Sequence, residues 1–248
     1  MNSTLRQIKQ SKLGKSLIVG MAFNAMLFNT TQAAESPAVS AATEQSSETV
    51  ASVNSKALLQ KKLEDYSGYQ ASFLQTVNDS EGQVIHESTG QLEFKQPGMF
   101  RWQVLEPEEE LLLSNGVAVW WYNPFVEQVT IYDAGQAMEK TPFALLVSRD
   151  QAVWDQFEIS TGSIADSFEI IPKDLSNAQV IKLEVRFDNS HLQQILITSR
   201  SRQVSIYQLS DQKRVSPKSA DFEFTIPAGI DVDDQRESKP VVEGNVSY

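Results

Sequence analysis

The amino-acid sequence predicts a mainly β protein, in which one large antiparallel sheet, curled or closed on itself, is covered by two α-helices. Three observations lead to this fold class. Many short segments alternate apolar and polar residues with a period of two, turn signals separate these segments, and two further segments carry apolar residues on one helical face. A sheet of about ten strands limits its exposed edges by curling or closing.

The chain begins with a predicted secretory signal peptide, residues 1–34. Four Lys and Arg residues precede an apolar run from Leu17 to Phe28, and the small residues Ala33 and Ala34 end the segment. The apolar run is shorter than the roughly 20 residues that a membrane-spanning helix needs. We therefore expect cleavage after Ala33 or Ala34 and export of the mature protein. An uncleaved membrane anchor is the alternative.

Cleavage would leave an acidic protein without cysteine. The whole chain has 21 Lys and Arg against 32 Asp and Glu, so the loss of four basic residues leaves 17 against 32, a net charge of −15. Nucleic acid and anionic membrane surfaces repel such a protein, so we expect no nucleic-acid partner. The absence of cysteine excludes disulfides, thiolate metal sites and a lipid-modified amino-terminal cysteine.

Composition also divides the mature chain. Residues 35–54 are rich in Ser, Ala, Thr and Glu and contain no aromatic residue, which is typical of a flexible leader. Residues 55–236 are predicted to form one domain. Residues 237–248 are predicted to be a flexible tail.

A first helix is predicted over residues 55–66. Ser55 is suited to cap its amino terminus, and Leu58, Leu59 and Leu63 share one face. A second helix is predicted to start at Thr141-Pro142, because proline is favoured at the first helical position. Its apolar residues are Phe143, Leu145, Leu146 and Val147.

The strands are predicted from alternation and from the turns between them. The clearest example is residues 181–187, where four apolar residues alternate with three charged ones. Turn signals include Asp79-Ser-Glu-Gly82 and Ser114-Asn-Gly116. The predicted strands are residues 71–77, 84–94, 99–105, 110–113, 117–122, 125–132, 153–159, 168–171, 181–187, 191–198 and 204–209.

Residues 99–122 hold an unusual density of aromatic side chains. Phe100, Trp102 and Val104 share one face of a predicted strand, while residues 117–122 are apolar on both faces. A strand that is apolar on both faces has to be covered on both. Either the core is double-layered, which composition alone favours, or the curved sheet and its helices enclose an apolar ligand cavity.

No pattern of catalytic or metal-binding residues appears. His86 and His191 lie in predicted strands without a metal-type partner at helical spacing. The acidic run from Glu106 to Glu110 surrounds a proline and is typical of a solvated turn. Asp231 to Asp234 lack the glycine and glutamate of a calcium loop, and no Gly-x-Ser-x-Gly motif is present. The sequence therefore predicts no enzyme, no metal site and no cofactor.

Several motifs, in order along the chain, resemble the outer-membrane lipoprotein carrier family LolA. They span about residues 58–236, and the most specific is Tyr122-Asn-Pro-Phe-Val-Glu-Gln128. The matching segments are Ser72-Phe-Leu-Gln75, Gly90-Gln-Leu-Glu-Phe-Lys-Gln-Pro-Gly-Met-Phe-Arg-Trp102, Trp120-Trp-Tyr-Asn-Pro-Phe-Val-Glu-Gln-Val129, Thr141-Pro-Phe143 and Pro227-Ala-Gly-Ile-Asp-Val-Asp-Asp234.

The resemblance implies an unclosed antiparallel barrel of about eleven strands with an α-helical lid. It also implies an apolar cavity for lipoprotein acyl chains, and so favours the cavity over the plain double-layered core. The expected lipid-binding residues are Phe100, Trp102, Trp120, Trp121, Phe125, Phe143 and Leu146. The expected lid contacts are Gln96, Leu59 and Leu63.

The resemblance further implies a periplasmic, monomeric chaperone. An inner-membrane ABC transporter of the LolCDE type would load it with acylated lipoproteins, and the outer-membrane receptor LolB would unload it. Two alternatives are a periplasmic enzyme acting on lipid or glycan, and a lipoprotein-sensing regulator of the same fold. The missing catalytic residues argue against the enzyme, and the lack of a predicted second domain after Tyr207 argues against the larger sensors.

The chain departs from the family pattern at Gln96, where members commonly have an arginine that ties the barrel to the lid. A glutamine amide donates hydrogen bonds without charge, and charge-assisted bonds are roughly twice as strong. The resemblance therefore implies a closed lid that is held less tightly in this protein.

Overall fold

The structure is a computed structural model, and it describes residues 45–135, 144–176, 178–189 and 191–237. All of these residues belong to one compact unit that spans residues 34–248. The predicted signal peptide, residues 35–44 of the predicted leader and residues 238–248 of the predicted tail lie outside the described residues. Residues 45–54 of the predicted leader are helical, so the prediction of a flexible segment is wrong there. Among the helices in these ranges, none has the length and apolar character needed to span a membrane.

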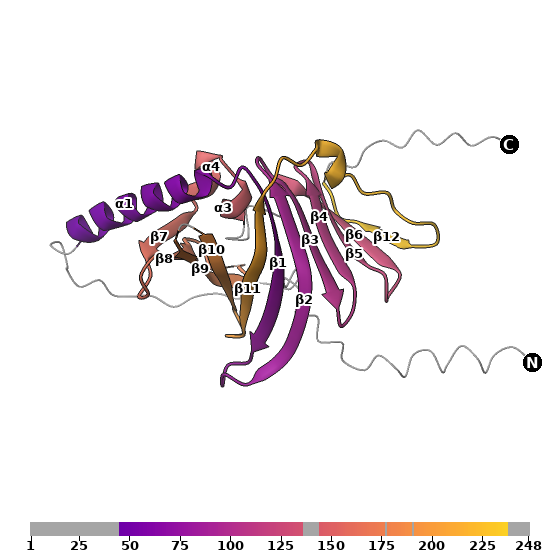
Figure 1. Cartoon of the computed structure of the whole chain (residues 1–248), viewed down its shortest axis with the longest axis horizontal. Coiled ribbons are helices and arrows are strands. Elements are labelled where there is room, and N and C mark those ends of the chain that lie inside the picture. The colour runs from indigo at the N-terminus through magenta and orange to yellow at the C-terminus, as the bar shows by residue number, and fades with distance from the viewer. Residues whose placement is uncertain (1–44, 136–143, 177, 190, 238–248) are drawn as a thin grey trace, which may run out of the picture. The chain divides into compact units, whose positions relative to one another are not determined.

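The described strands form one twelve-stranded sheet (Figure 1). Its order is β12-β6-β5-β4-β3-β2-β1-β11-β10-β9-β8-β7, so β12 and β7 are the two ends of an open sheet. All neighbours are antiparallel except β12 and β6, which are parallel. The strands are β1 (Gly68–Asn78), β2 (Val84–Lys95), β3 (Met99–Glu106), β4 (Glu110–Asn115), β5 (Ala118–Asn123), β6 (Gln128–Asp133), β7 (Phe157–Thr161), β8 (Ser167–Pro172), β9 (Val180–Asp188), β10 (His191–Ser199), β11 (Val204–Arg214) and β12 (Asp231–Asp234).

This architecture confirms the predicted unclosed antiparallel barrel, with one strand more than the eleven expected. The additional strand, β12, has the sequence Asp-Val-Asp-Asp, which shows no apolar alternation and gives no strand signal. It forms because its backbone pairs with β6, from Asp231 opposite Gln128 to Asp234 opposite Ile131. Charged residues on an end strand also discourage pairing with other chains.

Helix α1 (Gln45–Glu64) packs against β7, at one end of the sheet, on the face that we call the inner face (Figure 1). The helix starts ten residues before Ser55, so the predicted cap at Ser55 is wrong. Leu59 and Leu63 are fully buried, whereas Leu58 is exposed. Just after the helix, the Tyr66 ring contacts the rings of Tyr69 and Phe187, and its hydroxyl accepts a hydrogen bond from the Leu192 amide at 2.8 Å.

Two short helices, α3 (Ala144–Val147) and α4 (Gln151–Trp154), occupy the region of the second predicted helix. The predicted start at Thr141-Pro142 lies outside the described residues. The Asp150 carboxylate caps α4 by accepting a hydrogen bond from the Ala152 amide at 2.9 Å. A side-chain cap at this position ends the preceding turn and starts a new helix, so residues 153–154 are helical rather than the start of the predicted strand 153–159.

The carboxy-terminal segment covers the opposite, outer face of the sheet at β3 to β6. The 3₁₀ helix η1 (Ser219–Phe222) lies against β3 and β4, with Phe222 fully buried. Farther along, Phe224, Ile226 and Ile230 pack against apolar side chains of β5 and β6. The outer face of these strands is therefore dry, which explains why residues 117–122 are apolar on both sides.

Candidate functional site

The inner face of β1 to β5 carries a cluster of aromatic side chains. Strand register places Trp102 opposite Leu112 and Leu112 opposite Trp121, so that the two tryptophans lie in one row across three strands. Phe100 lies two residues along from Trp102 and therefore points to the same face. Phe100 and Trp102 are only 5% and 6% exposed.

Two aromatic residues that were not among the predicted site residues complete the cluster. The Phe73 ring centroid lies 5.0 Å from that of Trp102 and 5.5 Å from that of Tyr207. The Trp102 and Tyr207 rings meet edge to face at 4.7 Å. Gly90 makes room for this arrangement, since a Cβ there would collide with the Phe73 ring and the Gln103 carbonyl. Alternation within β1 and β11 indicates that Phe73 and Tyr207 are buried, but not that they meet across the sheet.

Trp120 does not belong to this cluster. Adjacent residues of a strand point to opposite faces, and Trp120 points to the outer face, where its ring lies 6.3 Å from that of Phe224. We therefore remove Trp120 from the expected lipid-binding residues. Trp120 thus belongs to a second core layer, as the double-layered interpretation predicts, while Trp121 faces inward. The ligand cavity stays a prediction.

The remaining predicted lipid-binding residues have different surroundings. Leu146 is fully buried in α3. Phe125 is 71% exposed in the turn between β5 and β6, so the predicted strand 125–132 starts too early, and β6 begins only at Gln128. Phe143 lies outside the described residues.

Gln96, in the turn between β2 and β3, holds this turn against α3 and the segment after it. Its Nε2 donates to the Leu146 carbonyl at 3.3 Å, and its Oε1 accepts from Arg149 Nε at 2.6 Å. The Gly98 amide donates to the Val147 carbonyl at 3.0 Å. Gln96 thus joins the turn between β2 and β3 to α3, and the Arg149 guanidinium supplies a charged donor to this contact. Its role as a lid contact stays a prediction.

The helices of the lid are also joined to one another. Lys56 of α1 forms an ion pair with Asp155, just after α4, at 2.6 Å. One turn farther along α1, Gln60 Nε2 donates to Gln151 Oε1 at 3.3 Å. Because these contacts are polar and partly exposed, their net contribution to stability is small. The lid is held mainly by the buried apolar side chains of α1 and α3, among them Leu59 and Leu146.

The inner face contains one notable carboxylate, Glu110 at the start of β4. Its side chain is half-buried and accepts hydrogen bonds from Trp121 and from Asn123, the latter at 3.4 Å. Burial raises the pKa of the Glu110 carboxyl above its ordinary value, and these two hydrogen bonds oppose the rise. In the described residues, no group of three or more His, Asp or Glu side chains gathers to hold a metal ion.

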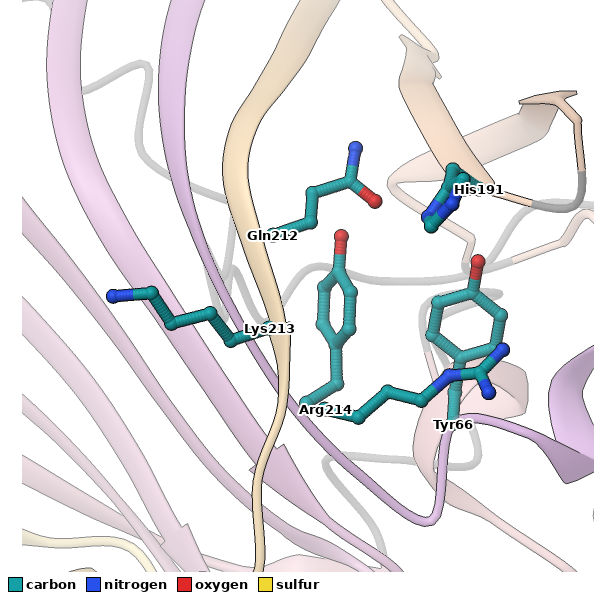
Figure 2. Close-up of a pocket in the computed structure, with 6 residues that line it drawn as sticks. Tyr66, His191, Gln212, Lys213 and Arg214 are labelled. Atoms are coloured by element: carbon teal, nitrogen blue, oxygen red, sulfur yellow. The ribbon is translucent and has the colours of Figure 1, made fainter.

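A pocket of about 350 Å³ lies elsewhere, where β10 stops pairing with β11 (Figure 2). Tyr66, His191, Gln212 and Arg214 surround it, whereas the Lys213 side chain points away from them in Figure 2. Its size is at the low end of ligand pockets. The rings of Tyr66 and Tyr69 line it beside the polar and cationic groups of Gln212 and Arg214.

Sequence comparison identifies the family of the chain. The family described as "Outer membrane lipoprotein carrier protein LolA" matches residues 64–225. The chain belongs to the LolA family. An outer-membrane lipoprotein carrier protein of Proteus mirabilis is 39% identical over 178 residues, which cover 72% of this chain and 87% of the relative. The Photorhabdus laumondii protein of the same name is 37% identical over 189 residues, or 76% and 92% of the two chains.

Solved structures show weaker likeness to this chain. A LolA superfamily protein of Nitrosomonas europaea has a TM-score of 0.45 at 14% identity, covering 68% of this chain and 97% of the other. An uncharacterized conserved protein of Thermus thermophilus has a TM-score of 0.47 at 12% identity, covering 73% and 99%. The family assignment therefore depends on the sequence matches. LolA proteins are carriers rather than enzymes, which agrees with the function expected from the sequence.

Proposed function

We propose that this protein is a periplasmic carrier that takes lipoproteins released from the inner membrane to the outer membrane. Membership of the LolA family and the names of its relatives support this function. We further propose that the acyl chains of the cargo bind to the inner face of the sheet, over Phe100, Trp102 and Trp121, and that Leu146 of the lid completes this surface.

The observation that carries this proposal is the aromatic cluster under a lid. Burial of an acyl chain contributes ~0.8 kcal/mol per methylene, so that one chain of about 14 methylenes contributes roughly 11 kcal/mol. A lipoprotein therefore cannot cross water unassisted at a useful rate, and a carrier has to offer a comparable apolar surface. The inner face offers one in its aromatic cluster, which lies beside the lid contact of Gln96.

The closed state explains how such a carrier can also release its cargo. Trp102 already packs against Phe73 and Tyr207, and Phe100 is buried on the same face. An acyl chain has to displace these contacts and the lid, so the gain from its burial is offset by their loss. Net affinity then stays low enough for transfer to a receptor without a nucleotide.

The partners follow from this function and remain proposals. An inner-membrane ABC transporter of the LolCDE type would load the carrier, and the receptor LolB would accept the cargo. We propose that the protein acts as a monomer in the periplasm. Residues 1–34 would serve as its signal peptide and residues 35–44, which precede α1, as a flexible leader.

Binding of a synthetic triacylated lipopeptide tests the proposal, with displacement of an apolar fluorescent probe as the readout. Phe100→Glu should weaken binding more than tenfold, because it places a charge against acyl chains. Gln103→Glu is the matched control, since it adds the same charge on the outer face of the same strand. Equal binding by wild type and Phe100→Glu would show that the cargo does not contact this face.

A further inference from the structure

The inner face changes from apolar to polar along its strands. Strand register arranges the side chains of β2 to β5 in three rows across the sheet. The row nearest the lid contact of Gln96 contains Phe94, Phe100, Ser114 and Val119; the second contains Leu92, Trp102, Leu112 and Trp121; the third contains Gly90, Val104, Glu110 and Asn123.

The polar character continues into β1 and β11. Gln75 and Ser88 are buried on the inner face, and Ser88 Oγ donates to Gln75 Oε1 at 2.7 Å. Gln75 Nε2 in turn donates to the Tyr207 hydroxyl at 2.9 Å. These bonds cross three neighbouring strands. The far end of the inner face is therefore a hydrogen-bonded polar border, whereas the two rows nearer the lid are mainly apolar.

Glu110 is the member of this border that lies next to the aromatic row. It pairs with Val104 of β3, and its carboxylate accepts hydrogen bonds from Trp121 and Asn123. A methylene chain that advanced past Trp121 would remove water from this carboxylate without replacing its hydrogen bonds. Such desolvation is unfavourable, more so for a charged group than for a neutral one.

We propose that Glu110 sets the length limit of the acyl-chain surface. Acyl chains lie over the rows of Phe100 and Trp102 and stop at the Glu110 carboxylate. Methylenes beyond that point stay in water and add no affinity. Glu110 is thus a specificity-determining residue for chain length, an inference that depends on the proposed function.

The test compares lipopeptides that share one peptide and differ only in acyl-chain length. For the wild type, affinity should rise with chain length and then reach a plateau. Glu110→Leu should move this plateau to longer chains, with a gain of roughly fourfold for each additional buried methylene. Glu110→Gln keeps the size and hydrogen-bonding capacity, and should move the plateau less, because only the charge is removed.

Glu87→Leu is the matched control. Glu87 is an exposed carboxylate on the outer face of β2, near the same end of the sheet, and its loss should leave the plateau unchanged. If Glu110→Leu unfolds, Glu110→Gln decides the matter alone. An identical plateau in wild type and the Glu110 variants would overturn the inference, as would a uniform loss of affinity at every length. Failure of the wild type to bind any lipopeptide would instead overturn the proposed function.

Discussion

Gln96 shows how one residue controls a contact between the sheet and its lid. Its amide donates to Leu146 and accepts from Arg149, so both of its polar atoms are used. The arginine that the family resemblance implies at position 96 is absent. Arg149, in the segment after α3, brings a guanidinium to the same contact. A hydrogen bond from a charged donor is stronger than a neutral one. The closed lid is therefore better held than Gln96 alone implies.

This arrangement predicts that Gln96→Arg by itself does not tighten the lid. The substitution would remove the Gln96 oxygen that accepts from Arg149, and it would place a second guanidinium next to that of Arg149. In an Arg149→Gln background, however, Gln96→Arg exchanges the two side chains, so that the contact again pairs one guanidinium with one amide. A double-mutant cycle on melting temperature should give a coupling of about 1 kcal/mol between the two positions. Additive effects of the two substitutions would contradict the contact.

The raised pKa of Glu110 predicts that the stability of the fold depends on pH. Because burial raises the pKa of this carboxyl above 4.5, the folded protein keeps its proton to higher pH than the unfolded chain does. At low pH the Glu110 carboxyl is protonated, and the fold has the full stability that the neutral carboxyl allows. As pH rises through the raised pKa, the buried carboxyl has to ionise and this stability is lost. Glu108 adds to the rise of the pKa, while Trp121, Asn123 and His86 oppose it.

Glu110→Gln should accordingly raise the melting temperature at neutral pH and have little effect below about pH 4. Melting curves of both proteins across this range are the measurement. A melting temperature of Glu110→Gln that falls below the wild type at neutral pH would show that the ionised carboxylate stabilises the fold.

Strand β5 shows what can and cannot be predicted at the level of an element. Its alternation and its two apolar faces are visible in the sequence, and they indicate that both faces are covered. The segments that cover these two faces lie far away along the chain. The sequence therefore does not tell which tryptophan points to the inner face and which to the outer face. Trp120 meets Phe224 of the carboxy-terminal segment, and Trp121 meets Glu110 of β4.

The carboxy-terminal segment should therefore contribute strongly to stability. Phe222→Ala leaves a cavity where a fully buried ring was, and should destabilise the protein by about 3 to 5 kcal/mol. Phe125→Ala, at an exposed turn, should change stability by no more than about 0.5 kcal/mol. Denaturant unfolding of both variants provides the comparison. Equal midpoints would mean that the segment adds little to the fold.

For the whole molecule, strand periodicity and turn signals predict one large antiparallel sheet, because each strand carries its own alternation. That the sheet is open is implied only by the family resemblance. Strand β12 is missed because backbone pairing alone forms it, and α4 because a single capping residue, Asp150, starts a new helix. The aromatic cluster is predicted only in part. Phe73, Tyr207 and Glu110 join it through strand register, which depends on partners far away in the sequence.

The most direct test of the central claim uses the opposite faces of two adjacent residues. A photoreactive benzoylphenylalanine at position 121 points inward, and the same group at position 120 points to the outer face. Irradiation with a triacylated lipoprotein should cross-link acyl chains to the Trp121→benzoylphenylalanine protein and leave the Trp120→benzoylphenylalanine protein unlabelled, as read by mass spectrometry of the linked peptides. Labelling at position 120 without labelling at position 121 would contradict an acyl-chain site on the inner face.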